Sequence, residues 1–349
     1  MEYLAKPNLI LESLLYLCAR ADGQERQRLE EHFRQKSPHA LAAFQERYAS
    51  FEALKQELDR RVAIAPGTLT RLFSNLEGFP YHMAGVYSPA FLLLAPAACR
   101  CCGDSAAFWA AQEDCTSDEA AQDILTALDL TGSDQAEYSS ATAQLIDSIL
   151  SMSLPAETRL ALLELHKNYR LVMQESVQCL YTALAVLEDM GPKLQALIDN
   201  FIWEIDAIGT EAYAQEISNF HIDPNVPCRI QPLLMLPVTY LFINTFGKDG
   251  HLVVYCGILR YALRNMELSA EAARNQIYES IRLLGDRTRF DIFCYLKDHP
   301  AYGQELSSHF GLARNTIHYH MSQLFKARLV RCTVEGAKTY YSIDKDRYS

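Results

Sequence analysis

A stretch near the end of the chain carries side chains that can hydrogen-bond to DNA bases and phosphates. Residues 311–332 read GLARNTIHYHMSQLFKARLVRC. Ile317, Met321 and Leu324 follow one another at intervals of four and three, so they form one apolar stripe of a predicted helix. Arginine can bridge the acceptors of guanine, asparagine those of adenine, and histidine or tyrosine can reach bases or phosphates. The residues of this kind off the stripe are Arg314, Asn315, His318, Tyr319 and Ser322.

The elements around this helix predict how it is held. A short helix over Gly303–Phe310 is closed by Gly311, the reading helix spans Arg314–Arg328, and strands follow at Leu329–Val334 and Lys338–Ile343. This order is that of a winged helix-turn-helix, in which apolar residues of the first helix fix the angle of the second. We expect Leu306, Phe310 and Leu312 to make that contact. The cations expected to neutralise DNA phosphates are Lys326, Arg328, Arg331 and Lys338.

The same region resembles the ArsR-type winged-helix repressors over about 75 of the 349 residues. His318 stands where that family usually has a small polar residue. The resemblance implies a bacterial, cytoplasmic transcription regulator that binds a double-stranded DNA operator as a homodimer, with an unidentified small-molecule effector as a further partner. It also adds Thr316 to the expected DNA-binding residues. For His320 a partly buried, orienting role is favoured over direct base contact. The matching residues are Leu284, Gly285, Asp286, Thr288 and Arg289, then Thr316, Ile317, His320 and Met321, then Leu329, Val330, Gly336, Tyr340 and Tyr341.

Charge is distributed unevenly along the chain. The net charge is −11, but residues 270–349 carry 12 lysines and arginines against 9 acidic residues, and the rest carries 20 against 34. A basic end on an acidic body is compatible with a nucleic-acid partner at that end. No apolar run approaches the roughly 20 residues of a membrane span, so we expect no membrane partner.

Helical spacing dominates the first two-thirds of the chain and predicts a mainly α protein with a small β component. We expect three parts: a helical N-terminal domain over 1–220, a small β-containing connector over 221–266 and the winged helix-turn-helix over 267–349. The N-terminal domain would serve signal sensing or dimerisation. Its expected helices include an amphipathic one near the start and others over Pro38–Leu58, Asp104–Leu130 and Pro155–Asp189.

Two further segments bear on assembly. Cys228–Asn244 and His251–Cys256 are rich in β-branched and aromatic residues and predict two or three strands, with a hairpin across Thr245–Gly250. A helix over Ser269–Leu284 is our hypothesis for part of the dimer contact. The residues expected to make that contact are Ile277, Ile281 and Leu284.

Ten cysteines are scattered along the chain, which is typical of free thiols in a reducing cytosol. Cys99, Cys101, Cys102 and Cys115 lie close enough in sequence to bind a soft ion as thiolates. Loop and core thiols are the favoured interpretation, so no metal is expected. A thiolate metal-responsive repressor stays open as an alternative. We expect Cys294 and Cys332, in the winged region, to be packing residues.

No motif of a common enzyme site occurs, neither Gly-x-Ser-x-Gly, nor a P-loop, nor Gly-x-Gly-x-x-Gly, nor His-Glu-x-x-His. We therefore expect no enzyme activity, no catalytic residues and no cofactor. A second alternative to a DNA-binding regulator is a protein-interaction module that keeps the winged-helix fold without binding DNA.

Overall fold

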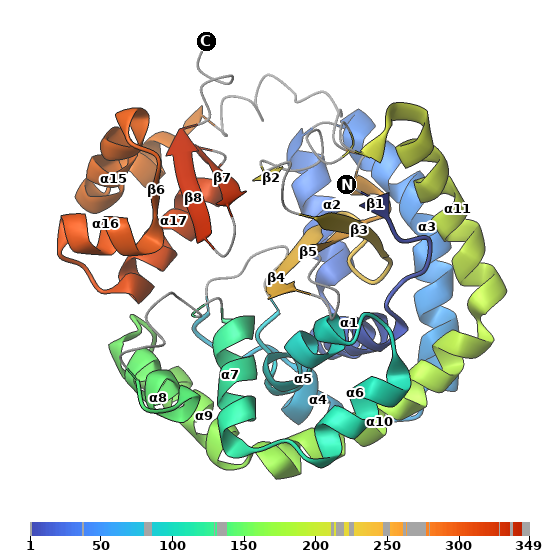
Figure 1. Cartoon of the computed structure of the whole chain (residues 1–349). Helices are drawn as coiled ribbons and strands as arrows, with labels where there is room; N and C mark the ends of the chain where they lie inside the picture. The colour runs from blue at the N-terminus through green and yellow to red at the C-terminus, as the bar shows by residue number, and fades with distance from the viewer. Residues whose placement is uncertain are drawn as a thin grey trace.

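Two hydrophobic cores organise the described part of the chain, one from Ile10 to Leu263 and one from Ile292 to Ile343. We call residues 2–263 the body and residues 277–343 the winged region. Figure 1 shows the winged region, in orange and red, beside the body. The computed structural model describes residues 2–36, 38–79, 86–128, 130, 138–210, 213, 220–222, 227–246, 252–260, 263, 277–278, 280–327, 329–335 and 338–343.

Helices make up most of the body, which confirms the predicted mainly α fold with a small β component. Within the described residues, no helix is long and apolar enough to cross a membrane. The helices are α1 Leu9–Asp22, α2 Glu25–Lys36, α3 Pro38–Arg61, α4 Pro66–Phe73, α5 Pro89–Arg100, α6 Ser105–Glu113, α7 Ser117–Ala127, α8 Ala141–Ser151, α9 Ala156–Lys167, α10 Tyr169–Asp189 and α11 Gly191–Ile208. The strands of the body are β1 Glu2–Tyr3, β2 Phe220–Ile222, β3 Cys228–Leu233, β4 Tyr240–Phe246 and β5 Leu252–Gly257.

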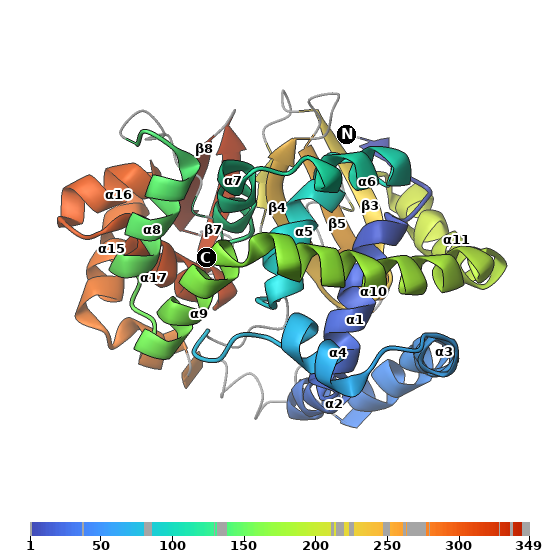
Figure 2. The same cartoon turned by 90° about the horizontal axis from the view of Figure 1, so that it is seen from below.

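Helix α1 lies at the centre of the body. Every residue from Ile10 to Cys18 is buried, so the prediction of an amphipathic helix is wrong for this segment. The cap residue Asn8 explains the placement, because its side chain serves two purposes. It accepts the N–H of Leu11 at 3.2 Å and donates to the carbonyl oxygen of Ala98 at 2.8 Å. Figure 2 shows the long helix α10 crossing over α1, with which it is in contact.

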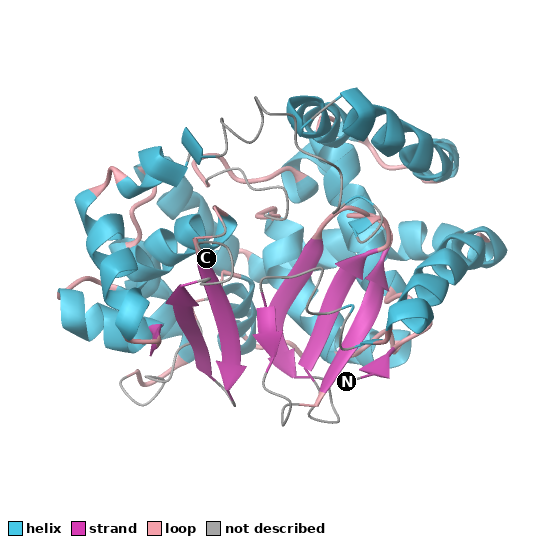
Figure 3. Ribbon diagram, turned by 90° about the horizontal axis from the view of Figure 1, so that it is seen from above, coloured by secondary structure: helices cyan, strands magenta, loops and turns pink. Residues whose placement is uncertain are grey.

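A four-stranded sheet, which we call sheet A, is part of the body's core. Its order is β1-β3-β5-β4, with β1 and β3 parallel to their neighbours and β4 antiparallel to β5 (Figure 3). The predicted strands and the β4–β5 pairing are confirmed, but β1 was not foreseen. Strands β3 and β5 bury side chains in the same core as the helices, so the predicted connector over 221–266 has no separate core of its own among the described residues. The division into three domains stays a prediction.

Two predicted helices are each broken in the structure. The helix predicted over Asp104–Leu130 is instead α6 and α7, because Thr116 begins a new helix by exchanging hydrogen bonds with Glu119. The Thr116 N–H donates to the Glu119 carboxylate at 2.8 Å, and the Glu119 N–H donates to the Thr116 hydroxyl at 3.2 Å. The helix predicted over Pro155–Asp189 is divided at Asn168 into α9 and α10. The helix predicted from Pro38 is confirmed as α3.

Within its described residues, the winged region contains helical residues before Gly285, then the helices α15, α16 and α17 and the strands β6, β7 and β8. A strand from the body completes its sheet. The sheet, which we call sheet B, has the order β2-β7-β8-β6. Strand β2 belongs to the body's sequence and pairs parallel with β7. The elements are α15 Arg287–Asp298, β6 Ala301–Tyr302, α16 Gly303–Phe310, α17 Arg314–Lys326, β7 Val330–Glu335 and β8 Lys338–Ile343.

Candidate nucleic-acid interface

Helix α15 is anchored at its start by two charged residues. The Asp286 carboxylate accepts the N–H of Arg289 at 2.9 Å, and this hydrogen bond holds the pKa of Asp286 below its usual value. The Arg289 guanidinium donates to the carbonyl oxygen of Leu283 at 2.6 Å. These bonds fix α15 to the helical residues before Gly285. The acidic and basic residues of this motif therefore have a structural role at the base of the winged region.

A tight turn sets the angle between α16 and α17. Gly311 adopts φ +63°, a left-handed conformation that favours glycine, and its N–H donates to the carbonyl oxygen of Ser307. The Ser307 hydroxyl in turn donates to the carbonyl oxygen of Leu312 at 2.6 Å. Helix α17 begins three residues after Gly311, as the sequence predicts.

Helix α17 buries one face and exposes another. Ile317, Met321 and Leu324 are buried in the second core together with Leu306, which confirms the predicted stripe. Tyr319 is 43% exposed on the other side of the helix. Thr316 and His318 are half-buried. The side chains of Arg314, Asn315, Ser322 and Lys326 lie outside the described part of the structure, although these residues belong to α17.

His320 is buried, with 8% of its surface exposed, whereas its neighbour Tyr319 is exposed. Burial lowers its pKa, and the positive charge of Arg289 acts in the same direction, while Asp286 opposes both. Within the described residues its Nδ1 atom is buried without a hydrogen-bond partner. His320 is therefore more deeply buried than the partly buried side chain that was predicted, and its orienting role stays a prediction.

The wing is an antiparallel hairpin of β7 and β8. Glu335 pairs with Lys338 at its tip, and Val330 pairs with Ile343 at its base. Strand β8 has the predicted bounds, and β7 is shifted by one residue. Arg331 is half-buried on β7, whereas Arg328 and the side chain of Lys338 lie outside the described residues. Strand β7 follows α17 in the chain and is in contact with it, so the hairpin lies beside that helix (Figure 1).

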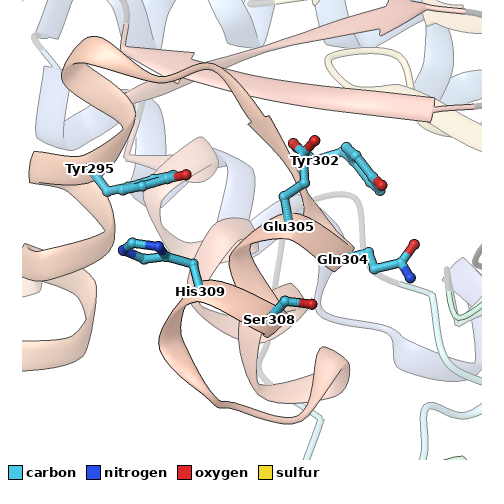
Figure 4. Close-up of a pocket in the computed structure, with 6 residues that line it drawn as sticks. All are labelled: Tyr295, Tyr302, Gln304, Glu305, Ser308 and His309. Atoms are coloured by element: carbon cyan, nitrogen blue, oxygen red, sulfur yellow. The ribbon is translucent and has the colours of Figure 1, made fainter.

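A shallow hollow of about 500 Å³ lies between α15 and α16. Figure 4 shows Tyr295 and His309 next to each other, and their ring centroids are 4.2 Å apart. The Glu305 carboxylate accepts the N–H of Tyr302 at 3.1 Å. The ring contact joins α15 to α16, and the hydrogen bond caps the start of α16. No motif in the sequence marks these residues. The residues lining the hollow are Tyr295, Tyr302, Gln304, Glu305, Ser308 and His309.

The cysteine cluster of the body is mostly buried. Cys99, Cys101 and Cys115 are buried and Cys102 is half-buried. Burial raises the pKa of Cys99 to about 12 and that of Cys115 to about 11, so both thiols are protonated at neutral pH. Soft metal ions bind the thiolate form. Within the described residues, no three His, Cys, Asp or Glu side chains lie together in a way that could hold a metal ion.

The prediction that Cys294 packs in the winged region is wrong, because Cys294 is exposed. Ile292 and Leu296 of α15 are buried, and a residue midway between them points to the opposite side of a helix. The side chain of Cys332, the other cysteine predicted to pack there, lies outside the described residues.

The comparisons with known proteins concern the winged region. The family model described as "Bacterial regulatory protein, arsR family" matches residues 286–331. Among solved structures, reduced HlyU from Vibrio cholerae N16961 is similar, with 23% sequence identity and a TM-score of 0.20. That alignment covers 21% of this chain and 77% of the other. A search of curated proteins found no significant match.

Proposed function

We infer that this protein is a DNA-binding transcription regulator, because its C-terminal region is an ArsR-type winged helix-turn-helix. The single observation that carries this inference is the family match over residues 286–331, which spans α15, α16, α17 and the start of β7. The exposed face of α17 supports it, since a helix-turn-helix reads DNA with the outer face of its second helix.

In the proposed complex, α17 lies in the major groove. Arg314, Asn315, His318 and Tyr319 contact base edges, with Arg314 suited to guanine and Asn315 to adenine. Their place at the N-terminal half of α17 supports this, because the first turns of a recognition helix approach the bases. Backbone and flanking contacts come from Thr316, Ser322, Lys326, Arg331 and Lys338, which set the register on the duplex.

We propose that two chains bind an inverted repeat through the helical segment before α15. Ile277 is 62% exposed, Tyr278 63% and Ile281 65%, and Leu284 packs against the second core. Residues at positions i, i+1 and i+4 lie on one side of a helix, so these three form an apolar surface at the base of the winged region. Pairing such surfaces around a two-fold axis would match the symmetry of a palindromic operator.

The DNA-binding proposal is tested by selecting genomic fragments with the purified protein and then measuring affinity for a selected site. Arg314→Ala should cost about 1–3 kcal/mol on that site and relax the preference for it over a scrambled duplex. Arg287→Ala is the matched control, because Arg287 is an exposed cation of the same region paired with Asp291 on α15. The control should bind as the wild type does.

Two results would contradict the proposal. Equal affinity of the wild type for selected and scrambled duplexes would show that the protein does not recognise a DNA sequence. Retention on duplex DNA that does not weaken with added salt would contradict the proposed phosphate contacts. Such contacts release counterions from the DNA, which makes binding salt-dependent. A protein-interaction module that keeps the winged-helix fold without binding DNA would show no salt-dependent retention on duplex DNA.

The dimer proposal has its own test in analytical ultracentrifugation. Ile281→Glu places a charge on the proposed contact and should shift the protein from dimer to monomer at micromolar concentration. Leu150→Glu is the control, because Leu150 is also exposed, at 57%, but lies on α8 of the body. A wild type that sediments as a monomer with operator present would overturn the proposed pairing.

A further inference from the structure

The outer edge of the wing is paired with a strand from the body. Phe220–Ile222 of β2 runs parallel to β7, and the residue partners are Phe220 with Cys332, His221 with Thr333 and Ile222 with Val334. Strand β8 occupies the other side of β7. The wing is therefore part of a larger sheet in which β2 covers the half of β7 that is nearer the hairpin tip.

Strand β2 is also tied closely to the body. Five residues separate Ile222, at the end of β2, from Cys228, where β3 begins in sheet A. A chain of that length spans on the order of 20 Å at most. Strand β3 is anchored firmly, because Ile230 and Leu233 are buried in the body's core. A displacement of β3 would thus reach the wing through β2.

We propose that β2 is a strap that holds the wing in a state of low DNA affinity and that it leaves β7 when the wing engages DNA. The inference rests on the proposed function. The interaction surface is the edge of β7 opposite β8, and its occupant is residues 220–222 of the same chain.

Steric fit is the first argument for the direction of this effect. Neighbouring strands lie about 4.8 Å apart, so β2 widens the wing beside the tip by that amount. The minor groove of B-DNA is only about 6 Å wide. A hairpin tip with a third strand attached at Val334 is too broad to follow the DNA backbone closely along that groove.

Charge is the second argument. Residues 1–269 carry 20 lysines and arginines against 34 acidic residues. While β2 is docked, the short tether keeps this acidic body next to the wing and hence next to the DNA phosphates. Repulsion between the two opposes binding, and release of β2 lets the body move away.

Ease of release is the third argument. The pairing involves three residue positions and is parallel. Parallel pairs are slightly less stable per residue than antiparallel ones, and a strand this short contributes few hydrogen bonds. The β7–β8 pairing, by contrast, joins six residue pairs in antiparallel register. The strap can therefore leave without dissolving the wing.

The experiment locks the strap with a disulfide between position 220 and the native Cys332. These residues are Cα partners in adjacent strands, and a spacing of about 4.8 Å between strands lies within the range that disulfides bridge. We expect oxidised Phe220→Cys to form the 220–332 link, identified by peptide mass spectrometry. The linked protein should bind a selected DNA site at least tenfold more weakly, and reduction should restore the affinity.

The control is Phe220→Cys combined with Cys332→Ser, in which oxidation should leave affinity unchanged. This control also covers oxidation of the other cysteines. A second measurement needs no cysteine: hydrogen exchange of residues 220–222 should speed up when the wild type binds DNA.

The strap proposal is overturned if the link forms and affinity is unchanged, or if the link does not form under oxidation. Slower exchange of residues 220–222 in the DNA complex would also overturn it. A reduced protein that binds no DNA would instead overturn the proposed function, since formation of the link is measured without DNA.

Discussion

The body and the winged region are built from contacts of different range. In the body, β1 at Glu2 pairs with β3 at Arg229, and the cap residue Asn8 bonds to Tyr255 at 3.3 Å. In the winged region, the packed residues all lie within about sixty positions of one another. The winged region can therefore fold from local signals, whereas the body must bring its two ends together before its sheet forms.

A matched pair of leucine truncations tests whether the two cores are independent. Leu11 on α1 and Leu306 on α16 are both fully buried, one in each core. Replacing a buried leucine with alanine leaves a cavity and costs about 2–5 kcal/mol. We expect Leu11→Ala to destabilise the body by this amount and leave the winged region unaffected, and Leu306→Ala to do the reverse.

The two regions can be followed separately. Both tryptophans, Trp109 and Trp203, lie in the body, so urea unfolding monitored by tryptophan fluorescence measures the body. Hydrogen exchange of the amides in α15, α16 and α17 measures the winged region. If either variant shifts both measurements together, the chain unfolds as one unit and the description of two independent cores fails.

The next effect concerns Glu12, a buried carboxylate of the body. Among the described residues, the winged region has no buried carboxylate. Glu12 on α1 accepts the N–H groups of Leu234 and Met235 at 2.7 and 2.8 Å, after strand β3. Burial raises its pKa to about 7, although these two donors and Lys55 oppose the shift. The native state therefore holds a proton that the unfolded chain, with a pKa near 4.5, releases.

The sign follows from that difference. The contribution of Glu12 to stability is fully present below pH 4.5 and is lost as pH rises through about 7, because the buried carboxylate must then ionise. At 1.36 kcal/mol per pKa unit the loss amounts to about 3 kcal/mol. Urea unfolding of the wild type and of Glu12→Gln between pH 4.5 and 8 should show the stability difference changing by this amount. A constant difference across that range would contradict the assignment.

The sequence predicts more of the winged region's fold than of the body's fold, because the contacts of the winged region are more local. Helix α16 and strand β8 have their predicted bounds, since Gly311 and the apolar stripe of α17 are local signals. Strand β1 has two residues and no such signal, and its partner lies at the other end of the body. The β2–β7 pairing could not be foreseen, because three residues must find a partner 112 positions later.

A close backbone approach in sheet A gives a smaller effect. A Cβ atom on Gly257, at the end of β5, would lie 2.5 Å from backbone atoms of Leu236 and Pro237. Gly257→Ala therefore forces the backbone apart and should cost the body about 1–3 kcal/mol. Gly191→Ala on α11 is the control, because nothing lies within 4 Å of its Cβ position, and it should gain up to about 1 kcal/mol. Fluorescence-monitored urea unfolding measures both, and equal stability of the two variants would contradict the close approach.

The smallest effect is expected in the winged region, where His320 gives a pH dependence of opposite sign to that of Glu12. Its pKa is lowered by burial, so below about pH 6.5 the unfolded chain binds a proton that the native state resists. The winged region should thus lose stability as the medium becomes acidic, while the body gains from Glu12. Hydrogen exchange of α17, corrected for intrinsic rates, should show this loss between pH 7 and 5.5 in the wild type. The loss should be weaker in His320→Leu, which keeps the packing and removes the titrating group. If both proteins lose protection equally, another group governs the acid sensitivity of the winged region. The opposite signs would then no longer separate the two regions.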